Sequence, residues 1–200
     1  MNNHYHHGDL KNALIQAGIE ILSREGIEAL SLRKVAKRAG VSHTAPYAHF
    51  VDKQALIAAI AAAGYQKLYN VLYLAQNPQV NASARLMSTA HAYLQFALDE
   101  PDHFKITFSG VVEAERNYPE YVEQSKRCFS LVVEVVEQCQ ADGHFICGDA
   151  YLIAVSIWSC IHGFVHLLLA NQLPGTLISQ YSVHDLFERH LQQVVQSNWG

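Results

Sequence analysis

The 200-residue sequence lacks the features that mark an enzyme, an exported protein or a β-rich fold. It has no glycine-rich phosphate loop, no GxSxG nucleophile turn and no HEXXH metal motif, so the sequence gives no support for catalysis or for a bound cofactor. The polar start MNNHYHHGDLK lacks the apolar stretch of a signal peptide. No segment alternates apolar and polar residues as a half-buried strand does. We therefore expect an all-α, non-enzymatic protein of the cytoplasm.

Closely spaced cysteines are also absent, although the sequence contains four cysteines in all. None of them forms the CxxC spacing of a metal or dithiol site. Without an export signal, we expect reduced thiols that are buried or incidental, and a redox switch is the alternative. The four are Cys128, Cys139, Cys147 and Cys160.

One long apolar segment raises the question of a membrane. Residues 150–169 include no Asp, Glu, Lys or Arg, and about 20 apolar residues are enough to span a bilayer. The segment nevertheless contains His162, His166 and Gly163 and has no basic flanks. A helix that is apolar all round is equally expected in a protein core or interface. We favour this second interpretation and expect no membrane association.

Charge is distributed unevenly along the chain. Residues 1–60 contain seven Lys and Arg against five Asp and Glu, a net charge of +2. The remaining residues contain seven against thirteen, a net charge of −6. We call the basic residues 1–60 the head. Because the rest of the chain is acidic, we predict that only the head approaches a polyanion.

The segment 31–50, SLRKVAKRAGVSHTAPYAHF, has the pattern of two short helices joined by a tight turn. Ser31 can cap the first helix, and Gly40 can end it with a positive φ. Ser42 can cap the second helix, and Pro46 must lie within or next to its first turn, so we expect this helix to begin near Ser42 or His43. Apolar residues at helical spacing, Leu32, Val35, Ala36 and Ala39, form one face of the first helix.

Such a pair of helices can read the major groove of DNA. Thr44 and Ala45 are candidates for contact with base edges or a thymine methyl group. Tyr47, His49 and Lys53 are candidates for phosphate contacts, with Arg33 on the flank. The complete set of candidate DNA-binding residues is Ser31, Arg33, Ser42, His43, Thr44, Ala45, Tyr47, His49 and Lys53.

The rest of the chain also has helical periodicity, interrupted by breakers such as Asn77–Pro78 and Asp142–Gly143. About nine helices are expected in total. Outside the segment 31–50 we predict helices over 9–25, 53–74, 82–98, 120–141, 150–170 and 183–196, with a short helical segment between Pro101 and Gly110.

Aromatic residues are frequent in the predicted helices of the acidic part. Such residues are often simple core packing, but the same side chains would line a ligand pocket with a few polar groups among them. His162 and His166 have the spacing of two metal ligands on a helix, yet nothing nearby completes a metal site. The candidate ligand-binding residues are Tyr93, Phe96, Phe104, Phe108, Phe129, Trp158 and His162.

The region Gly8–Leu68 resembles the DNA-binding domain of TetR-family transcriptional regulators. The resemblance rests on the amphipathic opening, GVS, Y-A-H-F and D-K-Q-A-L-I in this order. The sequences WSCIHG (158–163) and FKITFSG (104–110) resemble the WHG-type C-terminal domain of some members. The resemblance implies a three-helix DNA-binding domain over 8–68, with its helix-turn-helix at 31–50, and a C-terminal ligand-binding and dimerisation domain over 77–198.

The resemblance also implies a function, namely a ligand-responsive repressor that binds a double-stranded DNA operator. We expect a homodimer through the last two helices and release from DNA by a small hydrophobic or aromatic molecule. A metal- or redox-sensing regulator that uses His162, His166 or Cys160 is an alternative, as is a transcriptional activator. An enzyme or carrier whose head is only a packing module is a third possibility.

Overall fold

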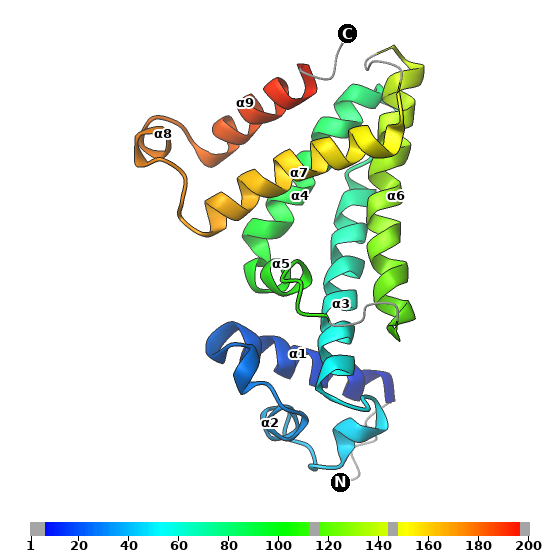
Figure 1. Ribbon diagram of the computed structural model, residues 1–200, viewed down its shortest axis with the longest axis vertical. Helices are drawn as coiled ribbons and strands as arrows, with labels where there is room; N and C mark the ends of the chain where they lie inside the picture. The colour runs from blue at the N-terminus through cyan, green and yellow to red at the C-terminus, as the bar shows by residue number, and fades with distance from the viewer. Residues whose placement is uncertain (1–6, 113–116, 144–147, 197–200) are drawn as a thin grey trace. The chain divides into compact units, whose positions relative to one another are not determined.

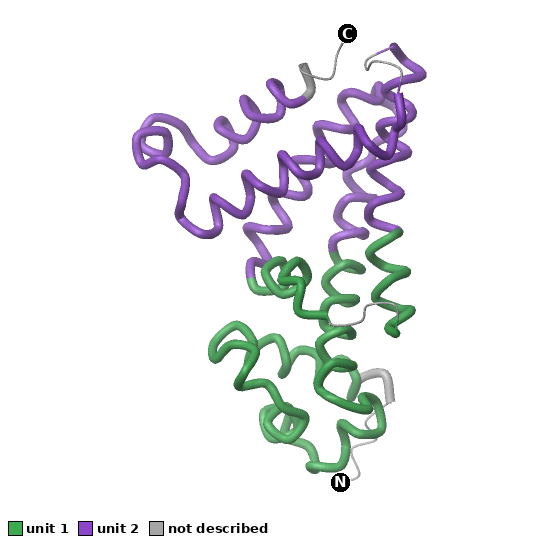
Figure 2. Tube along the Cα trace, in the orientation of Figure 1, with its two compact units in different colours: residues 1–67, 102–126 green, residues 68–101, 127–200 purple. Residues whose placement is uncertain are grey.

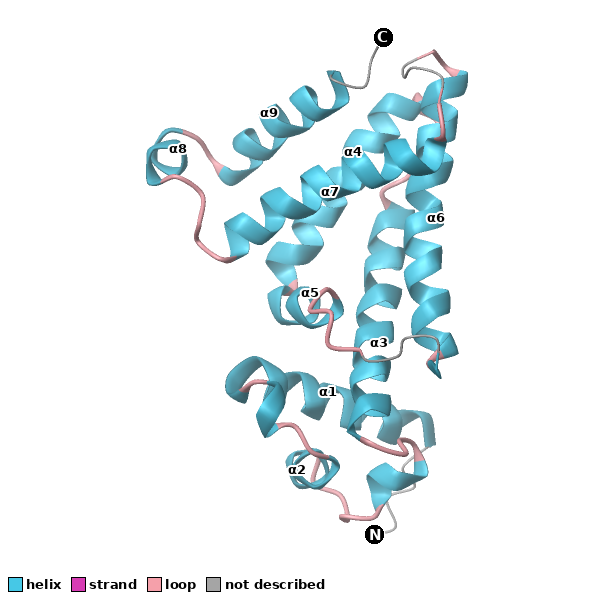
Figure 3. Ribbon diagram, viewed as in Figure 1, coloured by secondary structure: helices cyan, strands magenta, loops and turns pink. Residues whose placement is uncertain are grey.

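The computed structural model describes residues 7–112, 117–143 and 148–196, in which all regular structure is helical (Figures 1 and 3). The all-α fold and the number of about nine α-helices are confirmed for these residues. The α-helices are α1 (His7–Glu25), α2 (Leu32–Arg38), α3 (Lys53–Leu74), α4 (Ala82–Asp99), α5 (Pro101–Thr107), α6 (Pro119–Ala141), α7 (Ala150–Leu169), α8 (Gly175–Gln180) and α9 (Val183–Gln196), and two 3₁₀ helices are η1 (Ile27–Ala29) and η2 (Ala45–Ala48).

Short polar side chains fix the starts of several helices. The carboxylate of Asp52 accepts a hydrogen bond from the Ala55 N–H at 2.7 Å, at the start of α3. Asn81 and Asp149 do the same for α4 and α7, each with a bond of 2.8 Å. These bonds satisfy N–H groups that have no partner within the first turn. The caps explain why the helix boundaries agree closely with the sequence pattern.

The chain divides into two compact units, and the first comprises residues 1–67 and 102–126 (Figure 2). Its core includes Leu14, Val35 and Ile57, which come from α1, α2 and α3. Ile106 of α5 and Tyr121 of α6 belong to the same core, although they lie far along the chain. The predicted domain limits, 8–68 and 77–198, stay a prediction.

A close approach between α3 and α5 explains one glycine of the first unit. Gly64 is buried in α3, and a methyl group at its position would collide with the side chain of Thr107. Only a residue without Cβ therefore allows α5 to lie at this distance.

The second unit comprises residues 68–101 and 127–200, and in it α7 packs against both α4 and α9. Phe187 of α9 is fully buried, with the ring of His91 at 5.5 Å and that of Phe164 at 5.2 Å. Polar contacts add to this packing, because His91 Nε2 lies 2.5 Å from the Glu188 carboxylate. Aromatic burial and these contacts fix α9 on its neighbours.

Helix α7 buries only one of its faces within this single chain. Ile153, Ile157 and Val165 are buried, whereas Leu152 and Val155 on the other face are exposed. Within the described ranges α7 is the one helix long and apolar enough to cross a membrane, which by itself is weak evidence. One face of α7 is therefore buried in the core of the chain, and burial of its other apolar face in an interface stays a prediction.

The sequence did not predict two of the short elements, η1 and α8. Helix α8 begins at Gly175, with Pro174 at its N-cap position. Six residues make little more than one helical turn, which is too short for a periodic pattern to be visible.

Candidate functional site

The first helix of the segment 31–50 forms as its sequence predicts. The Ser31 hydroxyl accepts a hydrogen bond from the Lys34 N–H at 3.2 Å and caps α2. Leu32, Val35 and Ala36 of the predicted apolar face are buried. Gly40 has a φ of 70°, which turns the chain out of the helix. This part of the helix-turn-helix prediction is confirmed.

The second helix differs from the prediction. Residues Ala45–Ala48 form a single 3₁₀ turn, and no α-helix begins at Ser42 or His43. In an α-helix capped by Ser42, the first bond would run from the N–H of residue 46 to the Ser42 carbonyl. Pro46 has no N–H, and the Ala45 N–H occupies that carbonyl instead, at 3.1 Å. The Ser42 hydroxyl pairs with that of Thr44 at 3.1 Å rather than capping a helix.

Most of the candidate DNA-binding side chains in and around this turn are exposed. His43 and Thr44 are exposed, and the Tyr47 side chain is 57% exposed. Ala45 and His49 are half-buried, which leaves them less surface for DNA. Other exposed members of the predicted set are Ser31, Arg33 and Ser42.

Two of the predicted phosphate contacts have competing roles. The Lys53 ammonium donates to the Ile27 carbonyl at 2.6 Å, so it helps to hold α3 against η1. The Nε2 atom of His49 is buried, without a hydrogen-bond partner in the described part of the chain. Their contacts with phosphates stay a prediction, and Tyr47 is better placed for this role.

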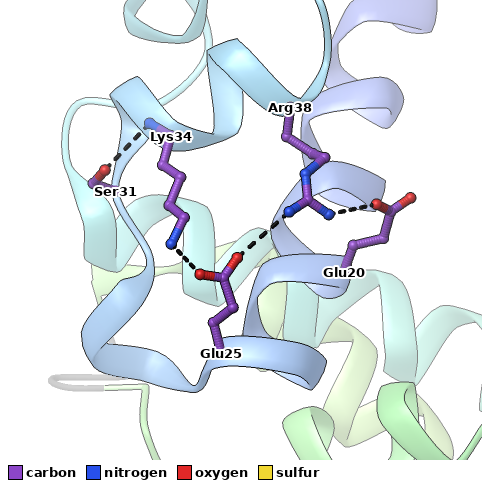
Figure 4. A network of polar contacts seen from close by, with 5 residues as sticks. All are labelled: Glu20, Glu25, Ser31, Lys34 and Arg38. Atoms are coloured by element: carbon purple, nitrogen blue, oxygen red, sulfur yellow. Dashed lines mark hydrogen bonds and ion pairs between the residues drawn. The ribbon is translucent and has the colours of Figure 1, made fainter.

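The four cations of α2 fall into two pairs, and the two members of each pair are four residues apart. Lys34 and Arg38 are paired with carboxylates of α1, as Figure 4 shows. Arg38 contacts Glu20 at 3.0 Å and Glu25 at 3.4 Å, and Lys34 contacts Glu25. The hydrogen bond from Lys34 holds the pKa of Glu25 below its usual value, so this carboxylate is charged at neutral pH.

Arg33 and Lys37 form the other pair, one turn apart on α2. Both are exposed, and neither has a polar partner among the residues that the structure describes. Lys37 was not among the predicted site residues. Arg38 has the same four-residue spacing from Lys34, so the sequence of α2 gives no signal that singles out Lys37.

The cap at Ser31 gives a first testable expectation. Ser31→Ala should lower the free energy of unfolding by about 1 kcal/mol, because one N–H of the first turn loses its partner. Urea denaturation followed by circular dichroism measures this change. Ser42→Ala is the matched control, since Ser42 bonds only to an exposed hydroxyl and should cost less than half as much. An equal loss in both variants would contradict the assigned cap.

The second unit contains a row of aromatic rings that join α4, α6 and α7. The Tyr93 hydroxyl lies 2.5 Å from His162 Nδ1. The ring of Trp158 lies 5.4 Å from that of His162 and 6.2 Å from that of Phe129. Four of the seven predicted ligand-binding residues therefore lie next to one another.

Of the other three predicted ligand-binding residues, two belong to the first unit and one to α4. Phe104 is fully buried in the first unit, where its ring is 4.9 Å from that of Phe108. Phe108 also packs against Tyr65 at 5.4 Å. Phe96 is buried in α4. These residues have the surroundings of core packing, which was the alternative interpretation of the aromatic pattern.

A small cavity of about 30 Å³ adjoins the aromatic row. Its walls include Tyr93 and Trp158, and its other lining residues are almost all apolar. This space holds about one water molecule, whereas sites for drug-sized ligands measure about 300 Å³ or more. The lining residues are Leu72, Leu86, Thr89, Ala90, Tyr93, Val132, Ile157, Trp158 and Ile161.

Burial and the neighbouring His166 lower the pKa of His162 to about 4 from an ordinary value of 6.5. The unfolded chain therefore binds this proton more tightly than the folded chain does. Stability should fall as the pH drops from 6.5 to about 4, by about 2 kcal/mol after allowance for partial exposure. Urea denaturation over this range should show a shallower loss for His162→Phe than for the wild type. Parallel pH dependences would exclude His162 as the cause.

Most of the thiols and the paired histidines, the candidate sensor groups, lie within the described residues. Burial raises the pKa of Cys128 to about 12 and that of Cys139 to about 11, which suppresses their thiolates. Cys160 is exposed, and Cys147 lies outside the described residues. Within the described ranges no three potential ligands gather around a metal position, although the rings of His162 and His166 are 4.3 Å apart.

Comparison with known sequences gives matches over both parts of the chain. Residues 14–60 match the family model described as bacterial regulatory proteins, tetR family. Residues 86–194 match the model described as the tetracyclin repressor-like C-terminal domain. The second match alone spans more than half of the chain.

Individual relatives show the same similarity. An uncharacterised HTH-type transcriptional regulator of Bacillus subtilis, YobS, is 30% identical over 49% of this chain and 51% of its own length. The class A tetracycline repressor of Escherichia coli is 42% identical over 26% of this chain and 24% of its own length. The aligned region thus spans about half of the first curated relative and a quarter of the second.

Solved structures extend the similarity to the whole chain. A Rhodococcus sp. RHA1 protein of unknown function is 30% identical, covers 100% of both chains and superposes with a TM-score of 0.83. A tetR-family regulatory protein from Rhodococcus RHA1 shares the fold, with a TM-score of 0.75 and 19% identity over 95% of this chain and 97% of its own. The resemblance seen in the sequence is confirmed, and the chain belongs to the TetR family of DNA-binding transcriptional regulators.

Proposed function

We propose that this protein is a homodimeric repressor that leaves its operator when a small apolar molecule binds to its second unit. One observation carries the proposal, namely the largely exposed segment 42–48 next to α2, a helix on which two exposed cations have no polar partner among the residues described. Exposed hydroxyl and aromatic groups next to free positive charge suit a duplex, whose bases and phosphates are contacted together.

In this proposal Thr44 and His43 face base edges, and Tyr47 contacts a phosphate. Arg33 and Lys37 supply the attraction to the backbone, which depends on the salt concentration. The turn η2 is shorter than a full reading helix, so fewer side chains are available for base contact. We expect a short half-site in consequence.

Dimerisation is proposed through α7 and α9, as in the sequence-based prediction. The exposed apolar side chains of α7 provide the driving force, because their burial would remove them from water. Two heads held by such a four-helix interface would contact successive major grooves, ~34 Å apart or a multiple of this distance.

The effector is proposed to bind at the cavity beside Trp158. The polar groups on its wall already have partners, since Thr89 donates to the Arg85 carbonyl at 2.8 Å and Tyr93 pairs with His162. The cavity must widen to accept an organic molecule. A ligand that binds only the widened form then shifts the protein towards that state, and only such differential affinity can alter DNA binding.

Other modes of regulation remain alternatives to this proposal. An activator would use the same DNA-binding turn. A redox sensor would rely on the exposed Cys160, since burial keeps Cys128 and Cys139 protonated. A cytoplasmic location follows from the proposed access to DNA.

Fluorescence anisotropy with DNA selected from a random duplex library tests the function. The wild-type protein should enrich one palindromic sequence and bind it as two protomers, far more tightly than a scrambled duplex. Small aromatic compounds should then release the complex at concentrations that change the tryptophan fluorescence of the protein. Binding that ignores sequence at every salt concentration would contradict a role as a specific regulator.

A further inference from the structure

Two of the four cations of α2, in the first unit, form ion pairs with carboxylates of the same chain. Lys34 and Arg38 lie one turn apart on α2 and face Glu25 and Glu20 of α1 (Figure 4). The other two cations, Arg33 and Lys37, have no such partners within the described residues. The helix therefore has one neutralised flank and one positive flank.

Stability is a poor explanation for this arrangement. Side-chain exposure is 36% for Glu25, 37% for Lys34 and 33% for Arg38. Ion pairs this close to solvent contribute little to folding. Burial of Leu32, Val35 and Ala36 already fixes α2. The ion pairs of Glu20 and Glu25 therefore have little effect on folding, and their effect on the charge available to DNA is larger.

We propose that Glu25, assisted by Glu20, is a specificity determinant that withholds Lys34 and Arg38 from the phosphates of non-operator DNA. The inference rests on the proposed function and adds a role for two carboxylates of α1. Non-specific binding comes almost entirely from cations that neutralise phosphates. A head with four free cations on α2 would bind any duplex in many orientations, which would lower the ratio of specific to non-specific affinity.

Glu25 is the stronger of the two determinants because it contacts both cations. Its lowered pKa keeps it ionised through the neutral range, so the pairing persists wherever the protein binds DNA. In the operator complex the turn 42–48 fixes the orientation of the head, and the flank with Arg33 and Lys37 provides the positive charge. Release of Lys34 and Arg38 from their ion pairs should therefore raise the affinity for random DNA more than the affinity for the operator.

Glu25→Gln tests this inference without removing any cation. Affinity for a scrambled duplex should rise about five- to tenfold near 0.1 M salt, and the salt slope should steepen by about one. Affinity for the library-selected operator should rise less than threefold. Glu20→Gln, which loses only the 3.0 Å contact to Arg38, should give a smaller rise.

Glu28→Gln is the matched control, since Glu28 is exposed on η1 and has no polar partner within the described residues. It removes the same charge three positions away and should change random-DNA affinity less than twofold. Adding Lys34→Gln to Glu25→Gln should abolish most of the gain, because the released cation is then missing.

Two outcomes would overturn the inference while leaving the proposed function intact. One is an equal gain in Glu25→Gln and Glu28→Gln, which would indicate a general charge effect. The other is an unchanged ratio of operator to random affinity in Glu25→Gln. A wild-type protein that binds no duplex would overturn the proposed function, and this inference with it.

Discussion

Leu152→Glu should convert the protein from a dimer to a monomer and reduce operator affinity about 100-fold or more. Leu152 is 67% exposed in the single chain and lies on the apolar face of α7 that we assign to the dimer interface. A twofold axis would bury two such carboxylates at once, and burial of an unpaired charge costs about 3 kcal/mol or more. A monomer contacts one half-site only, so the gain from linking two heads is lost.

Sedimentation velocity measures the oligomeric state, and anisotropy measures the binding. Leu74→Glu is the matched control, because it makes the same change in the same unit at a leucine that is 83% exposed at the end of α3. This control should remain dimeric and bind normally. A monomeric wild type, or dissociation of both variants alike, would contradict the assignment of the interface to α7.

Replacement of both Arg33 and Lys37 by alanine should weaken binding to operator and random DNA by about 60-fold at 0.1 M salt. Each lost phosphate contact changes the salt slope by about 0.9, so the slope should fall by about two. Neither side chain is paired within the described residues, so their removal should leave the folding of the head unchanged.

A variant with Lys105→Ala and Lys126→Ala controls for the loss of two charges. Both lysines are exposed and belong to the first unit, but they lie on α5 and α6 and not on α2 or in the turn 42–48. This control should change affinity less than threefold. If the two double variants lose affinity equally, long-range charge rather than phosphate contact governs binding.

The sequence-based prediction was wrong for the second helix of the helix-turn-helix, which we call the reading helix. A serine cap followed by helical spacing predicted an α-helix from Ser42, and Pro46 was judged compatible with its first turn. The structure contains only a 3₁₀ turn, because Pro46 falls at the residue whose N–H would make the first intrahelical bond. The total of about nine α-helices agrees although its members differ, with α8 present and the reading helix absent from the set.

The candidate ligand site was predicted in part. Tyr93, Phe129, Trp158 and His162 do lie next to one another in the second unit. Helical spacing alone relates only residues of one helix, such as Trp158 and His162 on α7. Whether an aromatic residue of another helix joins them depends on packing, and Phe104 and Phe108 instead belong to the first unit, where their rings lie 4.9 Å apart.

The sequence by itself determined the helices, the cap at Ser31, the basic character of the head and the resemblance to a known family. These features depend on local spacing, on side chains that bond to nearby N–H groups and on composition, all of which are readable along the chain. Only the tertiary structure decided which cations of α2 are free. That choice depends on α1 bringing Glu20 and Glu25 beside one flank of α2, which no pattern within α2 records.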